Sequence, residues 1–265
     1  MLHYAATEVP GNIMSYLRLF VRFTVLIVWT AFIGLLRVAV WPVVLVNERL
    51  DRRLRRAIVR LWGYVFFPFL GAKVVLEGPP PKHPFYLVCN HVSYIDPWLL
   101  NGLVGATFVA KGDVSKWPIL GFLSKALHTI FVDRSSRRDT VRVNELIKHA
   151  MDMGDGLVVF AEGGISRGLD VEPFKSSLIQ PAVGAGIPIH YAAISYRTHE
   201  GCPPASEIVG WWRPEPLMYH IRRLLRYRGF TATVRFGEEP IMGSDRKELA
   251  RRLREAVRAN YEPMP

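Results

Sequence analysis

The residues best suited to chemistry in this 265-residue chain are a histidine and an aspartate five positions apart, His91 and Asp96. A carboxylate that binds one imidazole nitrogen fixes the tautomer and stabilises the imidazolium, which leaves the other nitrogen free as a general base. On a regular helix the two side chains would point about 140° away from each other. They can therefore meet only across a non-helical turn. For this pattern alone, a structural histidine capped by a neighbouring aspartate is the simpler alternative.

The surrounding sequence predicts such a turn. The apolar run from Phe85 to Cys89 is typical of a buried strand, and it ends directly before Asn90 and His91. Asp96 and Pro97 then form a helix-start signal, with Asp96 as the expected N-cap. Open α/β sheets place their chemistry at the carboxyl ends of strands, where this turn lies. We expect the hydroxyl that His91 deprotonates to belong to the substrate.

Strand and helix patterns alternate along the rest of the chain, which predicts an α/β domain with a largely parallel central sheet flanked by helices. Apolar segments typical of strands lie at residues 73–77, 85–89, 106–110, 128–132, 157–160, 187–196 and 231–236. Helical patterns lie at 97–104, 116–127 and 141–153, and Ser244 is the expected cap of a closing amphipathic helix. We expect residues 67–265 to form this domain and residues 1–66 to form N-terminal membrane-docking helices.

The N-terminal region combines an apolar stretch with a basic one. Residues 23–36 carry no charge, which is short for a bilayer-spanning helix of about 20 residues but too apolar for a solvated surface. Residues 49–60 contain six arginines, expected on the face opposite to an apolar stripe. Arg18, Arg22 and Arg37 are placed to reach lipid head groups. This pattern favours an anionic membrane surface, and a solvated helix packed on its own domain is the alternative.

The net charge of +11 implies a polyanionic partner such as nucleic acid, anionic lipid, or an acidic carrier or cofactor. No nucleic-acid-binding module is recognisable, and nucleic acid would leave the apolar stretch unexplained. The two cysteines, Cys89 and Cys202, form neither a disulfide framework nor a metal motif. We therefore expect a membrane surface as the partner, no nucleic acid, and neither a metal nor a resident cofactor.

Polar groups follow two further predicted strands. Arg134 comes shortly after the strand at 128–132, and Glu162, Gly163 and Gly164 follow the strand at 157–160. Glycines let backbone N–H groups approach a ligand anion, and an arginine offers a planar fork to a phosphate. Taken singly, each of these features is common in turns and on surfaces.

Together and in this order, the segments resemble the glycerolipid acyltransferase family, which includes 1-acylglycerol-3-phosphate acyltransferases. Asn90, His91 and Asp96 match its N-H-x-x-x-x-D block. The segments at 130–134, 160–168 and 187–189 resemble its apolar-Arg, F-P-E-G-T and apolar-Pro-apolar blocks. Ala161 replaces the proline of the third block, and Gly164 replaces its threonine.

The resemblance implies a membrane-bound enzyme that moves a fatty acyl group from acyl-coenzyme A or acyl carrier protein to the free hydroxyl of a lyso-phospholipid. His91 would be the general base and Asp96 would orient it. The expected substrate-binding residues are Asn90, Arg134, Glu162, Gly163, Gly164, Ser166 and Arg167. The missing threonine leaves another acceptor open, such as a lyso-aminolipid. The expected location is the cytoplasmic face of a bacterial inner membrane, with the N-terminal segment either peripheral or single-pass.

One rival class competes for the third block. Residues 164–168 also read G-x-S-x-G, the nucleophile elbow of serine hydrolases and thioesterases, with Ser166 as nucleophile. An elbow needs its serine almost directly after a strand and a helix immediately beyond. Here residues 161–163 intervene, and residues 169–173 are a poor helix start. We therefore expect an acyltransferase.

Overall fold

The computed structural model describes residues 11–116, 121, 124–125, 127–132 and 137–264. Within these residues one sheet has seven strands, namely β1 (Ala72–Glu77), β2 (Phe85–Cys89), β3 (Thr107–Lys111), β4 (Ile130–Val132), β5 (Gly156–Phe160), β6 (Ile189–Thr198) and β7 (Phe230–Phe236). Their order across the sheet is β1-β7-β6-β2-β5-β3-β4, and all neighbours are parallel except β6 and β7. The predicted largely parallel α/β sheet is confirmed.

Strand β2 lies inside the sheet and is buried at every position from Phe85 to Cys89. A continuous apolar strand is what a parallel sheet covered on both faces requires. The predicted strand limits agree with the structure to within two residues for all seven strands. Strand β6 runs to Thr198, two residues further than predicted, because its end pairs antiparallel with β7.

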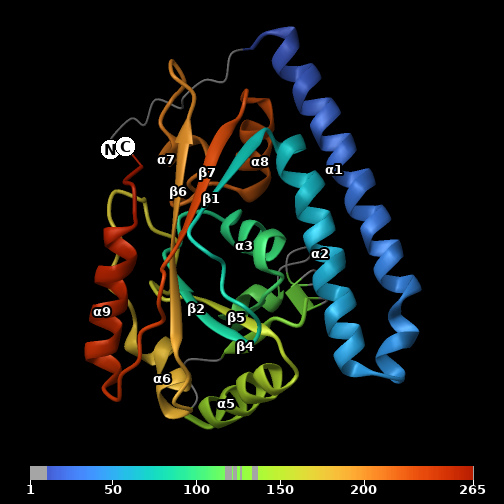
Figure 1. Ribbon diagram of the computed structural model, residues 1–265. Coiled ribbons are helices and arrows are strands. Elements are labelled where there is room, and N and C mark those ends of the chain that lie inside the picture. The colour runs from blue at the N-terminus through green and yellow to red at the C-terminus, as the bar shows by residue number, and fades with distance from the viewer. Residues whose placement is uncertain (1–10, 117–120, 122–123, 126, 133–136, 265) are drawn as a thin grey trace.

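Helices cover both faces of the sheet (Figure 1). One core is shared with α2 (Glu48–Leu70), α3 (Asp96–Val104), α7 (Ala205–Ile208) and α8 (Leu217–Arg226). The other core is shared with α5 (Arg137–Asp152), α6 (Ser176–Gly184) and α9 (Arg246–Ala259). Asp245, rather than the expected Ser244, caps α9, because its carboxylate accepts the N–H groups of Lys247 and Glu248. The helix predicted over 116–127 lies largely outside the described residues.

Helix α1 (Ile13–Ala39) is continuous and is joined to α2 by a short 3-10 helix, η1 (Trp41–Leu45). It lies beside α2 along one side of the molecule (Figure 1). The segment Ile13–Val43 is long and apolar enough to cross a membrane, and almost none of it is buried within the protein. The boundary predicted between residues 66 and 67 falls within α2 and stays a prediction.

Two arginines of α1 turn toward the protein, which corrects the expectation that they reach for head groups. Arg22 donates to the carbonyl oxygens of Tyr227 and Arg228, at 2.5 and 2.8 Å. Arg18 donates to the carbonyl oxygen of Arg226 at 2.6 Å. Carbonyl groups at the end of a helix have no partner within it, so α1 supplies donors to the end of α8 and is thereby tied to the α/β domain.

Helix α2 also turns several arginines inward, which corrects the prediction of one basic face opposite the apolar stripe. Arg52, Arg55 and Arg56 all bind the carboxylate of Asp155, which is fully buried just before β5. The other three arginines of the segment 49–60 remain exposed. A buried carboxylate needs paired cations and hydrogen-bond donors, so this cluster fastens α2 to the sheet.

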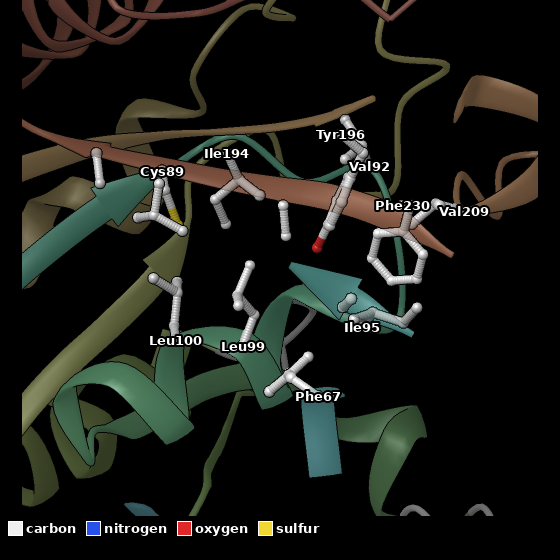
Figure 2. Packing of buried hydrophobic residues seen from close by; sticks show 14 of the residues in the cluster. Phe67, Cys89, Val92, Ile95, Leu99, Leu100, Ile194, Tyr196, Val209 and Phe230 are labelled. Carbon is white, nitrogen blue, oxygen red and sulfur yellow. The ribbon is translucent and has the colours of Figure 1, made fainter. Parts of the chain in front are cut away.

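Two glycines let α2 approach α3. A Cβ atom added at Gly63 of α2 would lie 2.6 Å from the Cα atom of Gly102 in α3. Their helix backbones therefore touch at this crossing, where any larger side chain would separate them. On its other side α3 presents Leu99 and Leu100 to the core beneath the sheet (Figure 2). Helix α2 thus packs directly on α3, the helix that begins at Asp96.

We predict that Asp155→Asn lowers the free energy of unfolding by about 3–5 kcal/mol, because three guanidinium groups lose their shared carboxylate. Urea unfolding in detergent solution measures this loss. Asp170→Asn is the matched control, since Asp170 pairs with Arg258 but both side chains are roughly half exposed. An exposed pair contributes at most about 1 kcal/mol. Equal losses in the two variants would contradict the anchoring role of Asp155.

Candidate active site

The turn between β2 and α3 is non-helical and brings His91 and Asp96 into contact. Nδ1 of His91 lies 2.8 Å from Oδ2 of Asp96, so a proton on Nδ1 is donated to the carboxylate. The imidazole stacks on Phe160 with 4.0 Å between ring centroids. Its side chain is 15% exposed, and no described residue is hydrogen-bonded to Nε2. This is the arrangement that general-base chemistry requires.

Asp96 is fully buried, and both of its oxygens are hydrogen-bonded. Besides His91, Oδ2 accepts the backbone N–H groups of Val92 at 2.7 Å and Ser93 at 2.9 Å. The sequence indicates Asp96 as the N-cap of α3, but α3 begins without a side-chain cap. The carboxylate instead turns back into the preceding turn, where it both shapes the backbone and orients the imidazole.

Tyr196 is a partner of Asp96 that the sequence pattern does not predict. Its hydroxyl donates to Oδ1 of Asp96 at 2.7 Å, from strand β6 and 100 residues away in the chain. The side chain is only 3% exposed. A buried tyrosine usually finds a hydrogen-bond partner for its hydroxyl. The apolar strand around Tyr196 predicts that the tyrosine is buried and that its hydroxyl has a partner. It does not indicate which residue the partner is.

Asn90 lies beneath the site. Its side-chain amide donates to the carbonyl oxygen of Ile194 at 2.9 Å and accepts the N–H group of the same residue at 2.8 Å. The side chain is fully buried. Both of its polar groups are therefore used to extend the pairing of β2 with β6. The resemblance assigns Asn90 to substrate, whereas this geometry gives it the task of joining two strands.

Glu162 joins the loop after β5 to the turn between β2 and α3. One carboxyl oxygen accepts the N–H group of His91, and the other accepts that of Glu172, both at 3.1 Å. The residue is 6% exposed. Burial raises the pKa of Glu162 to about 8, although the two N–H donors act in the opposite direction. Through these two hydrogen bonds, Glu162 connects the backbone of His91 to the loop that contains Glu172.

Ser166 is also bound to the turn between β2 and α3. Its N–H and hydroxyl groups both donate to the carbonyl oxygen of His91, at 2.8 and 3.2 Å. Strand β5 ends at Phe160 and α6 begins only at Ser176, so Ser166 lies well inside a long loop. In the described part of the chain, its hydroxyl has no imidazole nitrogen as a partner. The hydrolase alternative therefore lacks both the elbow and the base that it needs.

The residues expected to bind the acceptor head group are arranged more openly. Gly163 has a φ angle of +75°, which favours glycine. Gly164 is exposed, and a Cβ atom there would meet nothing within 4 Å. Arg167 is exposed, and its guanidinium carbon lies 4.9 Å from the ring centroid of Trp212. Arg134 lies outside the described residues.

The described residues contain no group of three or more His, Cys, Asp or Glu side chains that could hold a metal ion. They do bring together a histidine with one free nitrogen, a buried carboxylate that supports it, and an open glycine loop nearby in the fold. Chemically, this arrangement can remove a proton from a hydroxyl group that arrives at Nε2 of His91.

Comparisons with known proteins identify acyltransferases as relatives of this chain. The sequence profile of the Acyltransferase family matches residues 73–195. The lyso-ornithine lipid O-acyltransferase of Pseudomonas aeruginosa is 34% identical over 207 residues, which are 77% of this chain and 78% of that protein. The 1-acyl-sn-glycerol-3-phosphate acyltransferase of Neisseria meningitidis serogroup B is 29% identical over 211 residues, 77% of this chain and 80% of that one.

A solved structure shares the fold. The crystal structure of the 1-acyl-sn-glycerophosphate (LPA) acyltransferase PlsC from Thermotoga maritima superposes with a TM-score of 0.67. The match covers 94% of this chain and 93% of that one at 23% sequence identity. It therefore includes both the sheet and the N-terminal helices.

We predict that Glu162→Gln weakens the dependence of stability on pH. The folded pKa of about 8 lies above the ordinary value of 4.5, so the folded protein holds a proton that the unfolded chain releases. The free energy of unfolding should then fall as pH rises from about 4.5 to 8, by at most about 1.4 kcal/mol per pH unit. Glutamine cannot titrate, so urea unfolding at pH 5, 6, 7 and 8 should give a flatter curve for the variant.

The control for this measurement is Glu172→Gln, because Glu172 is an exposed carboxylate in the same loop. Its stability curve should run parallel to that of the wild type. If the curve for Glu162→Gln were also parallel to the wild type, the raised pKa of Glu162 would be refuted.

Proposed function

The chain belongs to the acyltransferase family, and we propose that it moves a fatty acyl group from a thioester donor to the free hydroxyl of a lyso-lipid. The observation that carries this proposal is the pairing of His91 with the buried Asp96, which leaves Nε2 of the imidazole free. The position of the pair at the carboxyl end of β2 supports it further, since ligands of open α/β sheets bind at that edge.

In the proposed reaction, Nε2 of His91 takes the proton of the acceptor hydroxyl while the hydroxyl oxygen attacks the thioester carbonyl carbon. The new C–O bond forms as the carbonyl electrons move onto oxygen, which gives a tetrahedral intermediate. Collapse of this intermediate restores the carbonyl and breaks the C–S bond. The imidazolium returns its proton to the departing thiolate, and Asp96 stabilises the imidazolium between the two steps.

Two acceptors suit this chemistry, 1-acylglycerol-3-phosphate and a lyso-aminolipid such as a lyso-ornithine lipid. We place the head group beside Gly163, Gly164 and Arg167, with Arg134 as a further cation carried over from the resemblance. Gly164 replaces the family's threonine and offers no hydroxyl to a phosphate. This replacement, together with the relatives named for lyso-ornithine lipid, favours testing the aminolipid beside the phosphate.

The acyl donor in this proposal is acyl-coenzyme A or acyl carrier protein. Both are acidic, and a net charge of +11 raises the encounter rate with either of them. The charge therefore supports a soluble thioester donor without choosing between the two.

We place the enzyme on the cytoplasmic face of a bacterial inner membrane, with α1 lying in one leaflet. Exposed apolar side chains run along α1 and η1, from Ile13 to Leu45. Arg22 ties the first half of α1 to the end of α8, and Arg37 ties its end to Asp51 of α2 at 2.7 Å. Such a helix could cross the bilayer only by breaking these contacts or by drawing the polar domain into hydrocarbon. A helix that lies in the plane of one leaflet buries its apolar side chains in the membrane and keeps the contacts of Arg22 and Arg37 with the protein.

We predict that His91→Ala lowers acyl transfer by about 10²–10⁴-fold, because it removes the general base. Fold and vesicle binding should persist. The assay measures thiol release from acyl-coenzyme A and from acyl carrier protein, with 1-acylglycerol-3-phosphate and lyso-ornithine lipid as acceptors. The combination that supports turnover identifies both substrates.

Two further variants make the assay decisive. His149→Ala is the matched control, since its side chain is 53% exposed on α5, and it should keep the wild-type rate. Ser166→Ala should retain substantial activity. Thiol release without an acceptor that survives His91→Ala but is lost in Ser166→Ala would mean a thioesterase and would overturn the proposal.

The in-plane placement of α1 predicts that both of its flanks face the cytoplasm. Gly11→Cys and Arg49→Cys would each be introduced in a Cys202→Ser background, because both positions are exposed. Inverted membrane vesicles expose the cytoplasmic face to a membrane-impermeant maleimide, which should label both cysteines before detergent is added. Labelling of Gly11→Cys only after detergent, with Arg49→Cys labelled throughout, would establish a single-pass helix instead.

A further inference from the structure

The two oxygens of Asp96 depend on different parts of the protein. Oδ2 is bound by the catalytic turn and by His91, whereas Oδ1 accepts a hydrogen bond from the hydroxyl of Tyr196 at 2.7 Å, its one partner among the described residues. Asp96 is 0% exposed, so bulk solvent does not reach its carboxylate. The charge that supports His91 therefore depends on a residue from β6.

The position of the Tyr196 hydroxyl is fixed by its strand and by its ring. The amide of Asn90 binds both backbone groups of Ile194, two residues before Tyr196 and hence on the same side of β6. The tyrosine ring packs edge-on against Phe230, with 5.8 Å between centroids. Figure 2 shows the ring reaching from β6 toward the start of α3.

The hydroxyl acts as a donor throughout the usable pH range. Burial raises the pKa of Tyr196 well above its ordinary value, and the neighbouring Asp96 raises it further. A phenol that stays protonated next to a carboxylate donates to it and shares its negative charge. Phenylalanine would preserve the ring and remove only this donor.

We propose that Tyr196 is a positioning residue of the catalytic pair, whose hydroxyl fixes the Asp96 carboxylate and thereby orients His91 as a base. This inference rests on the proposed function, in which His91 deprotonates the acceptor. It adds a third member to the pair and gives that member no contact with substrate.

Loss of the hydroxyl has two electrostatic effects with the same sign. First, an Asp96 oxygen without its donor takes up a proton more readily. Second, a carboxylate with fewer hydrogen-bond donors attracts the His91 imidazolium more strongly and so stabilises it. In both cases a higher pH is needed to reach the state in which Asp96 is charged and His91 is neutral. The acid limb of kcat/KM must then move to higher pH.

Among the described residues, the titratable groups that face Asp96 or Tyr196 are Cys89 on β2, Tyr94 before α3, Glu162 after β5 and Tyr261 after α9. Burial raises the pKa of each of these four acids. Glu162, at about 8, is the member that titrates near neutral pH. The measurement is therefore repeated in a Glu162→Gln background, where this contribution is absent.

The test compares Tyr196→Phe with the wild type in the acyl-transfer assay from pH 5 to 9. We expect kcat at pH 7 to fall by about 10-fold or more, the range of a hydrogen bond to a charged group. The KM for the acceptor should change by less than about twofold. The acid limb of kcat/KM should move up by about half a pH unit or more, so that raising the pH restores part of the lost rate.

Tyr86→Phe is the matched control. Tyr86 is a fully buried tyrosine of β2 whose hydroxyl donates to the carbonyl oxygen of Leu178 at 2.7 Å, in the other core of the sheet. It should lose a similar amount of stability in urea unfolding while keeping the wild-type pH profile. An unchanged acid limb in Tyr196→Phe, or a rise in the acceptor KM at constant kcat, would overturn the positioning role.

Failure of this inference differs from failure of the proposed function. If the wild type transfers no acyl group, or if His91→Ala keeps the wild-type rate, the acyl-transfer mechanism itself is wrong. If His91→Ala is inactive and Tyr196→Phe behaves like Tyr86→Phe, only the role of Tyr196 is refuted.

Discussion

A charged carboxylate is stable inside a protein only where donors replace the water that it has lost. The site satisfies this condition for Asp96 with two backbone N–H groups, one imidazole and one phenol. These donors come from the turn after β2 and from β6, so the pair exists only when both are in register with the start of α3. The amide of Asn90 fixes that register through Ile194. The buried charge thereby couples the proposed catalytic pair to the assembly of the sheet.

The second buried carboxylate, Asp155, is compensated in a different way. It lies at the amino ends of the parallel strands, just before β5, whereas the turn that holds Asp96 follows the carboxyl end of β2. Three arginines of α2 bind Asp155. Guanidinium groups neutralise a carboxylate and anchor a helix. The same solution at Asp96 would cancel the negative charge that stabilises the His91 imidazolium. Neutral donors keep that charge available, which explains why one site holds a cluster of cations and the other a phenol.

The sequence predicted what depends on local pattern. The apolar run of β2 and the five-residue spacing of His91 and Asp96 were sufficient to place a non-helical turn at the carboxyl edge of a parallel sheet. Partners distant in the chain were beyond such reasoning. An arginine stripe has the same pattern whether it faces water or a buried aspartate 100 residues away, as Arg55 does. Likewise, no local signal connects Tyr196 to Asp96, or turns Asp96 away from its own helix.

The contacts of the catalytic pair are separate from the region that would recognise a head group. His91 and Asp96 are held by buried groups, whereas Gly164 and Arg167 lie on an exposed loop. A change at Gly164 therefore alters no contact of the pair. This separation gives a physical reason why relatives named for a phosphate-bearing and an ornithine-bearing acceptor resemble the same chain. In the proposed mechanism the base acts on a hydroxyl, which both acceptors supply, and the exposed positions Gly164 and Arg167 can vary without disturbing the buried Asp96.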